Sequence, residues 1–233
     1  MNRSTLNATP LSGAYRHQGF TLVEILTVIA IIIILMGAGA VGIGNINAGK
    51  GVTSAVATCE SLFEEARMIA VSKRCKARVI VDINSKSSDN YLRRVVIVHE
   101  KIKADGTVEA GTWVMPNRPY DIPKGAFFSV QYSALNKGAG KINEQTLGGT
   151  DIKTNFHGKY AYYEFNEEGI FADAGSSFVV GSGVRPIGQE PTTTKGAARD
   201  FSGFVVWRNG RTSSYRNPGQ IPNLPESDQP FYF

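Results

Sequence analysis

One long uncharged stretch constrains this chain more than any other feature of its sequence. From Ile25 to Gly49 there is no charged residue, and as a helix this stretch would span roughly 37 Å, at ~1.5 Å per residue. The hydrocarbon core of a bilayer is about 30 Å thick. Residues 25–36 are apolar all round apart from Thr27, which is typical of a helix in lipid or in the middle of a bundle. We therefore expect a membrane-spanning helix near the N-terminus.

A single carboxylate, Glu24, stands at the edge of this apolar run, directly after Gly19-Phe20-Thr21-Leu22-Val23. An ionisable group there is costly unless it is paired, so it marks a functional position. An ordinary secretory signal would place its cleavage site after a shorter apolar core. A plain membrane anchor would need no glutamate at its edge, but it stays open as the alternative interpretation.

The segment from Gly19 to Glu24, with the apolar run behind it, resembles the class III signal of type IV pilins and type II secretion pseudopilins. The resemblance implies that a prepilin peptidase cuts between Gly19 and Phe20 and that the new N-terminal Phe20 is methylated. It also makes Glu24 the fifth residue of the mature chain, with a role in assembly. The similarity covers only the N-terminal part of the sequence.

The sequence predicts an α+β fold. Apolar residues recur at helical spacing from Val52 to Ala70, so we expect one helix from Thr21 to Lys73 whose second half packs on a sheet. Alternation with a period of two then predicts an antiparallel domain of about seven strands. Asn209-Gly210, between two apolar runs, predicts a hairpin. The expected strands are residues 77–83, 91–99, 112–115, 127–132, 160–165, 177–180, 201–207 and 211–215, with long loops at 134–158 and 181–199.

These patterns divide the chain into five parts. Because basic residues beside a span tend to stay in the cytoplasm, Arg3 and Arg16 predict that the leader lies inside and the domain outside. The expected parts are a leader at 1–19, a transmembrane and assembly helix at 20–49, an amphipathic helix at 50–76, a β-rich domain at 77–217 and an irregular tail at 218–233.

Three further stretches resemble the GspH/FimT-like minor pseudopilins. They are Glu64-Glu65-Ala66-Arg67 continuing to Arg78-Val79, Phe165-Asn166-Glu167-Glu168-Gly169, and Val205-Val206-Trp207-Arg208-Asn209-Gly210-Arg211.

The two cysteines, Cys59 and Cys75, are expected to be free thiols. If both lie on one helix they are ~24 Å apart, whereas a disulfide needs Cα atoms within about 7 Å. We expect Cys59 on the packed face of that helix.

No constellation typical of an enzyme is present, so we predict no catalytic residue, no cofactor and no metal site. The sequence has no HxxxH, CxxC, Walker A or GxSxG pattern. His99 is interpreted as a surface residue at a strand end. Asp228 and Glu226 are isolated acids in a proline-rich tail, so no calcium site is expected.

The expected function is therefore that of a structural filament subunit. The resemblance implies a single-pass protein of the bacterial inner membrane that later joins a pilus or pseudopilus. Its partners would be other pilin subunits, the prepilin peptidase, the inner-membrane assembly platform and lipid. Glu24 would pair with the N-terminal amine of a neighbour's Phe20, which would set the register between subunits.

A DNA-binding minor pilin of a DNA-uptake system is the second alternative. Its contacts would be Arg208, Arg211 and Arg216, which lie around the last hairpin with aromatic residues between them. DNA-binding relatives carry a Gly-Arg-x-Arg stretch here, whereas this chain has Gly210-Arg211-Thr212-Ser213. DNA is therefore the less favoured partner.

Overall fold

The computed structural model describes residues 21–135, 140–193, 200–225 and 231–233, without the side chains of residues 34–50. The chain divides into two compact units, residues 1–43 and residues 44–233. The predicted leader and its cleavage site between Gly19 and Phe20 lie outside the described residues.

Helix α1 runs from Leu22 to Lys73, as the apolar and then amphipathic pattern predicts. Within the described part of the chain, no helix combines the length and apolar character needed to cross a membrane. The span predicted at 20–49 includes Phe20 and the side chains of 34–49, which are not described.

The end of α1 is formed by a left-handed residue. Arg74 has a φ of 50°, and the Cys75 N–H donates to the carbonyl of Ala70 at 3.2 Å, which is the hydrogen bond of a Schellman motif. Lys73 places a positive charge in the last turn, where the helix dipole favours it. Cys75 therefore follows the helix, which corrects the expectation that both cysteines lie on it. Both thiols are free, as predicted, and Cys59 is on the packed face of the helix; Cys75 is buried as well.

The antiparallel β-rich domain predicted from the sequence is present, and in the described residues its strands form two sheets. The larger has six strands in the order β3-β2-β1-β7-β6, with β4 also paired to β2, and the smaller has four in the order β10-β9-β8-β5. The bounds are β1 Ala77–Asp82, β2 Arg94–Ile102, β3 Val108–Val114, β4 Tyr120–Asp121, β5 Ala126–Phe128, β6 Asn143–Leu147, β7 Gly158–Phe165, β8 Ser176–Ser182, β9 Phe201–Val206 and β10 Thr212–Ser214.

Both faces of the larger sheet are covered. Val79 and Val81 in β1 point into the main core, whereas Ile80 between them belongs to a second cluster on the opposite face, as the alternation of side chains along a strand requires. The second cluster consists of Ile80, Val96, Val98, Leu147, Ile152 and Tyr160.

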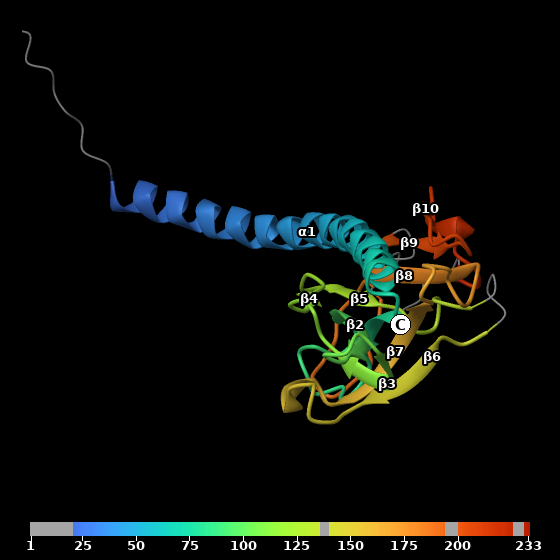
Figure 1. Ribbon diagram of the computed structural model, residues 1–233. Coiled ribbons are helices and arrows are strands. Elements are labelled where there is room, and N and C mark those ends of the chain that lie inside the picture. The colour runs from blue at the N-terminus through green and yellow to red at the C-terminus, as the bar shows by residue number, and fades with distance from the viewer. Residues whose placement is uncertain (1–20, 136–139, 194–199, 226–230) are drawn as a thin grey trace, which may run out of the picture. The chain divides into compact units, whose positions relative to one another are not determined.

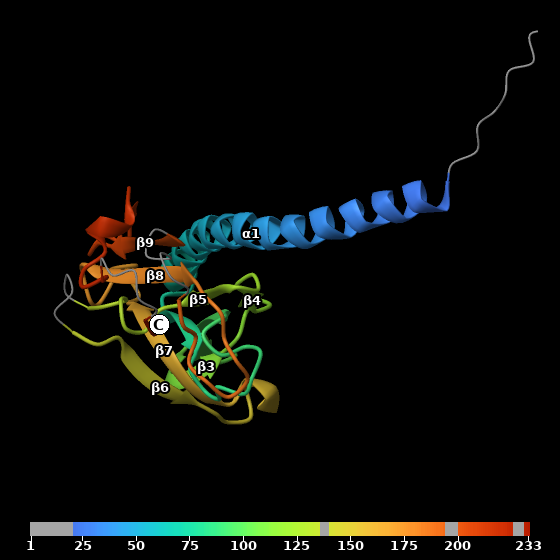
Figure 2. The ribbon, with the colours of Figure 1, turned by 180° about the vertical axis from the view of Figure 1, so that it is seen from behind.

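The main core lies between the second half of α1 and the two sheets. Figures 1 and 2 show the C-terminal end of α1 beside β8 and β9. Phe63 of α1 is fully buried, and its ring makes edge contacts with Tyr163 and Phe204 at 5.1 Å and with Phe178 at 5.6 Å. The amphipathic half of the helix is thus packed as the sequence predicts.

Several predicted strands have shifted boundaries, and two of these shifts have a clear local cause. The second strand begins at Arg94 instead of residue 91, because Leu92 has a φ of 56° and belongs to a turn. The strand expected at 127–132 ends at Phe128, because the hydroxyl of Ser129 accepts from the Tyr132 N–H at 3.0 Å and folds the chain into a turn.

The predicted loop at 134–158 and the tail contain structure that the sequence pattern misses. Strand β6 and the 3-10 turn η2, Thr154–Phe156, lie within that loop. The tail has a 3-10 turn, η4, at Pro218–Gln220. Phe233 is buried against Phe127 and Phe201, so the described end of the tail is part of the core.

Candidate assembly site

The N-terminus of α1 is closed by a reciprocal pair of hydrogen bonds. The Thr21 N–H donates to Glu24 Oε2 at 3.4 Å, and the Glu24 N–H donates to Thr21 Oγ1 at 3.2 Å. This is a capping box, with a hydroxyl residue before the helix and an acid three positions later. The Thr-x-x-Glu spacing in the sequence is itself the signal of such a cap, so Glu24 has a capping role in addition to the assembly role expected for it. Glu24 is exposed and is held on its own helix.

On both sides of Glu24, the described part of the helix carries exposed apolar side chains. Leu22 is 77% exposed and Ile33 is 63% exposed. An apolar surface of this kind is typical of a site that contacts lipid or other proteins. The exposed residues are Leu22, Val23, Ile25, Leu26, Val28, Ile29, Ile31, Ile32 and Ile33.

The three stretches that resemble minor pseudopilins come together around Arg67 in the second unit. Arg67 Nε donates to the carbonyl of Gly169 at 3.3 Å. Gly210, in the turn between β9 and β10, lies directly against the same side chain, because a Cβ there would be 2.4 Å from Arg67 Cδ. One arginine of α1 therefore joins the helix to two turns far away in the sequence.

Both turns need their glycines. Gly169 has a φ of +74° and Gly210 a φ of +77°, a region that residues with a side chain rarely adopt. Asn166 fixes the first turn, since its side-chain oxygen accepts from the Ile170 N–H at 2.8 Å. The hairpin predicted from Asn209-Gly210 is confirmed, with Thr212 opposite Val206.

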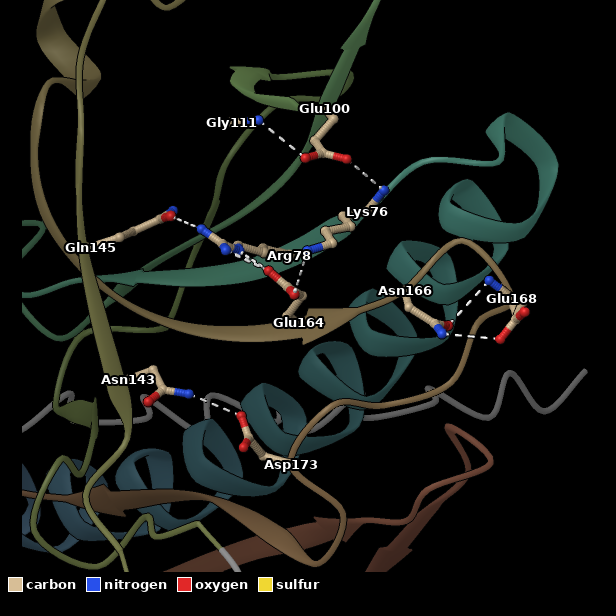
Figure 3. A network of polar contacts seen from close by, with 10 residues as sticks. All are labelled: Lys76, Arg78, Glu100, Gly111, Asn143, Gln145, Glu164, Asn166, Glu168 and Asp173. Carbon is tan, nitrogen blue, oxygen red and sulfur yellow. Dashed lines mark hydrogen bonds and ion pairs between the residues drawn. The ribbon is translucent and has the colours of Figure 1, made fainter. Parts of the chain in front are cut away.

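A second polar network lies on the opposite face of the larger sheet (Figure 3). Arg78 Nε donates to Glu164 Oε2 at 2.6 Å, and Arg78 also bonds Gln145 on β6. The guanidinium lies 4.1 Å from the ring centroids of Trp113 and Tyr162. Because every partner belongs to another strand of the same sheet, we interpret this network as a structural link between β1, β3, β6 and β7.

Glu100 extends the network at the β-bulge between β2 and β3. Its carboxylate is buried and accepts from the Lys76 N–H and the Gly111 N–H, both at 3.1 Å. Two backbone donors thus balance the cost of burying this carboxylate.

His99 is buried, which corrects its interpretation as a surface residue. Its Nδ1 is 2.7 Å from the carbonyl of Glu100, and its Nε2 is 2.7 Å from Lys73 Nζ. Since the carbonyl can only accept and the ammonium can only donate, the ring is neutral with its proton on Nδ1. Burial, with the Lys73 charge as a further cause, lowers the pKa of His99 below its ordinary value of 6.5.

Acidification should therefore destabilise the protein through His99. Its pKa is lower in the folded chain, so the unfolded chain binds more protons once the pH falls below about 6.5. The stabilising contribution is complete above that pH and is lost as the pH falls toward the folded-state pKa. We expect His99→Gln to reduce the loss of unfolding free energy between about pH 7.5 and about pH 5, measured by urea denaturation. His157→Gln is the control, and an unchanged pH dependence in His99→Gln would contradict this assignment.

The three arginines considered for DNA, Arg208, Arg211 and Arg216, are all exposed around the last hairpin. Trp207 is 41% exposed and its indole N–H donates to Ser213 Oγ at 2.8 Å.

No group of three or more possible metal ligands occurs among the residues that the structure describes.

Comparison with known proteins identifies the N-terminal segment. Residues 15–40 match the model of the prokaryotic N-terminal methylation motif. No curated protein matches the chain.

Solved structures with a similar chain path include two minor pilin-type proteins. The minor pseudopilin EpsH from the type 2 secretion system of Vibrio cholerae is 12% identical, covering 72% of this chain and 98% of its own, with a TM-score of 0.38. The type IV minor pilin FimU of Pseudomonas aeruginosa is 15% identical, covering 77% and 96%, with a TM-score of 0.38. Similarities at this level do not support a functional assignment by themselves. The match to the N-terminal methylation motif over residues 15–40 is therefore the finding on which a proposal for function rests.

Proposed function

We propose that this protein is a structural subunit of a pilus or pseudopilus and that it acts by assembly rather than by catalysis. The match of residues 15–40 to the N-terminal methylation motif carries the proposal. Within that match, Gly19-Phe20 precedes the apolar run and Glu24 stands at its edge.

Processing and anchorage follow from the same segment. A prepilin peptidase cuts between Gly19 and Phe20, and Phe20 becomes the methylated N-terminus. Residues 20–49 hold the subunit in the inner membrane, with Arg3 and Arg16 of the leader in the cytoplasm and the β-rich domain outside. The assembly platform then transfers the subunit into the filament.

In the filament, Glu24 pairs with the N-terminal amine of Phe20 on a neighbouring subunit. In the free subunit the same carboxylate accepts from the Thr21 N–H of its own helix, so it has a local partner until the neighbour's ammonium replaces it. Pairing neutralises two charges in an apolar surrounding. The exposed apolar side chains from Leu22 to Ile33 lose their contact with lipid and pack against neighbouring helices.

Within the family we propose a minor subunit of the GspH/FimT type. The support is the arrangement around Arg67, where the three stretches of that resemblance meet at Gly169 and Gly210.

The test is Glu24→Leu, scored for membrane level, cleavage and presence in sheared filaments. Leucine is easier to place in lipid than a carboxylate, so membrane level and cleavage should be normal. Incorporation into filaments should fall by at least about tenfold, because a neighbour's buried ammonium without a partner costs several kcal/mol. N-terminal mass analysis of the unaltered protein should give a chain that begins at methylated Phe20.

Thr21→Val is the matched control, because it removes the hydroxyl of the capping box and keeps the Glu24 charge. It should leave incorporation largely intact if the charge pairs with a neighbour. Equal losses of incorporation in Glu24→Leu and Thr21→Val would mean that Glu24 acts only as a helix cap. A mature chain that begins at Met1 would overturn the proposal.

A further inference from the structure

A cavity of about 370 Å³ lies where three loops of the second unit meet. The loops are those between β1 and β2, between β4 and β5, and after β8. Its lining residues are Asp89, Arg93, Lys124, Gly125, Phe127, Gly183, Val184 and Arg185. Three of these eight side chains are cationic and one is anionic.

The Arg185 side chain lines this cavity and is mostly buried, and within the described residues it uses few of its hydrogen-bond donors. Its side chain is only 10% exposed, and its Nη2 is 3.9 Å from Oδ1 of Asp89, a side chain that is itself 94% exposed. Its hydrogen bond within the described residues, from Nη1 to the Tyr91 carbonyl, is long at 3.4 Å. A guanidinium has five N–H donors, and burying them without acceptors is costly.

The rings of Tyr91 and Phe127 hold this guanidinium in place. Their centroids lie 5.8 and 5.9 Å from Arg185 Cζ, within the range of a cation–π contact. These ring contacts hold the guanidinium in position. They do not use its N–H donors, which lie in the plane of the guanidinium. Arg185 is thus oriented and still able to donate.

The other two cations contribute charge in different ways. All three nitrogens of Arg93 donate to backbone carbonyls: Nε and Nη2 to that of Ile122 at 2.9 and 2.6 Å, and Nη1 to that of Asp89 at 3.0 Å. Its positive charge is therefore fixed at the cavity wall. Lys124 is exposed, and it forms no ion pair with any carboxylate in the described residues.

We propose that this cavity is a binding site for an oxyanion, a phosphate or carboxylate group, with Arg185 as its principal ligand. The planar fork of a guanidinium matches both groups with paired hydrogen bonds. Arg93 and Lys124 add positive charge, and the cavity has room for a small anion. The site is independent of the assembly role of the N-terminal helix, and it gives a function to Arg185 in the segment after β8.

The test uses the full chain in detergent micelles, labelled with ¹⁵N-arginine and titrated with inorganic phosphate at constant ionic strength. The Nε–H signal of Arg185 should shift and saturate, with half-saturation at roughly 1 mM, an affinity that an anion of five heavy atoms can supply. A parallel titration with acetate distinguishes a carboxylate ligand from a phosphate ligand. A response to acetate equal to that of phosphate indicates a carboxylate ligand, and a response to phosphate alone indicates a phosphate ligand.

Arg185→Gln should weaken phosphate binding by at least about tenfold, because charge-assisted hydrogen bonds are lost. In this variant, binding is followed by the Nε–H signal of Arg93. Lys124→Gln should weaken phosphate binding less than Arg185→Gln. Because Lys124 is exposed, this variant still tests the proposal if Arg185→Gln fails to fold. Arg118→Gln, an exposed arginine outside the cavity, should bind like the unaltered protein. A linear response without saturation, or equal weakening by Arg118→Gln and Lys124→Gln, would overturn the proposal.

Discussion

Replacing Phe63 by alanine should lower the free energy of unfolding by about 3–5 kcal/mol. The Phe63 ring is fully buried where α1 meets both sheets, with edge contacts to Tyr163, Phe165, Phe178 and Phe204. Alanine would remove these contacts and leave a cavity, because the surrounding rings belong to three strands that cannot all move inward. Urea denaturation followed by near-ultraviolet circular dichroism measures the loss.

Met68→Ala is the control on the same helix. Met68 is 69% exposed, so its truncation should change stability by less than about 0.5 kcal/mol. Phe63→Leu keeps most of the volume and should cost less than Phe63→Ala. If Phe63→Ala and Met68→Ala cost the same, α1 does not dock on the sheets as described.

Gly203→Ala should destabilise the protein by roughly 3 kcal/mol, the upper end of the usual cost of overpacking. Gly203 lies in β9 opposite Val179 of β8. An added Cβ would be 2.3 Å from the carbonyl oxygen of Phe178 and 3.0 Å from the Cα of Val179. Both atoms belong to the backbone, so relief requires that the two strands move apart. Thermal unfolding of the purified variant measures the effect.

Gly148→Ala makes the same chemical change where nothing lies within 4 Å of the new Cβ. It should leave the melting temperature nearly unchanged. A Gly203→Ala variant as stable as Gly148→Ala would show that β8 and β9 are not paired at this point.

The sequence predicted elements whose signal is local. The extent of α1 follows from a helical period that continues to Lys73, and the last hairpin follows from Asn209-Gly210. Strand β6 was missed because Asn143–Leu147 is mostly polar and pairs only with β7 at the edge of the sheet. The division into two sheets was missed because pairing partners such as β5 and β8 are distant in the chain and carry no local signal.

The functional residues also divide into those that have a local signal in the sequence and those that do not. Glu24 was found because a carboxylate beside an apolar run is conspicuous, while its bond with Thr21 needed only the spacing of a capping box. Arg185 could not be found from the sequence, because its burial depends on Tyr91, in the loop between β1 and β2, and on Phe127 of β5. Burial of His99 likewise depends on Lys73 and on the bulge after Glu100.

The docking of the first element of the chain on its last hairpin has a consequence for folding. Ser214 of β10 bonds Glu60 of α1 across 154 positions, and contacts this distant in sequence make folding slow. At about 5–20 residues per second, a ribosome makes Phe204 roughly 7–28 s after Phe63. Until β8 and then β9 have been made, the apolar face of α1 lacks the strands of the smaller sheet that contact Phe63. The nascent chain is therefore most prone to aggregate before its final hairpin exists, and shelter by a chaperone or by membrane lipid would matter most then.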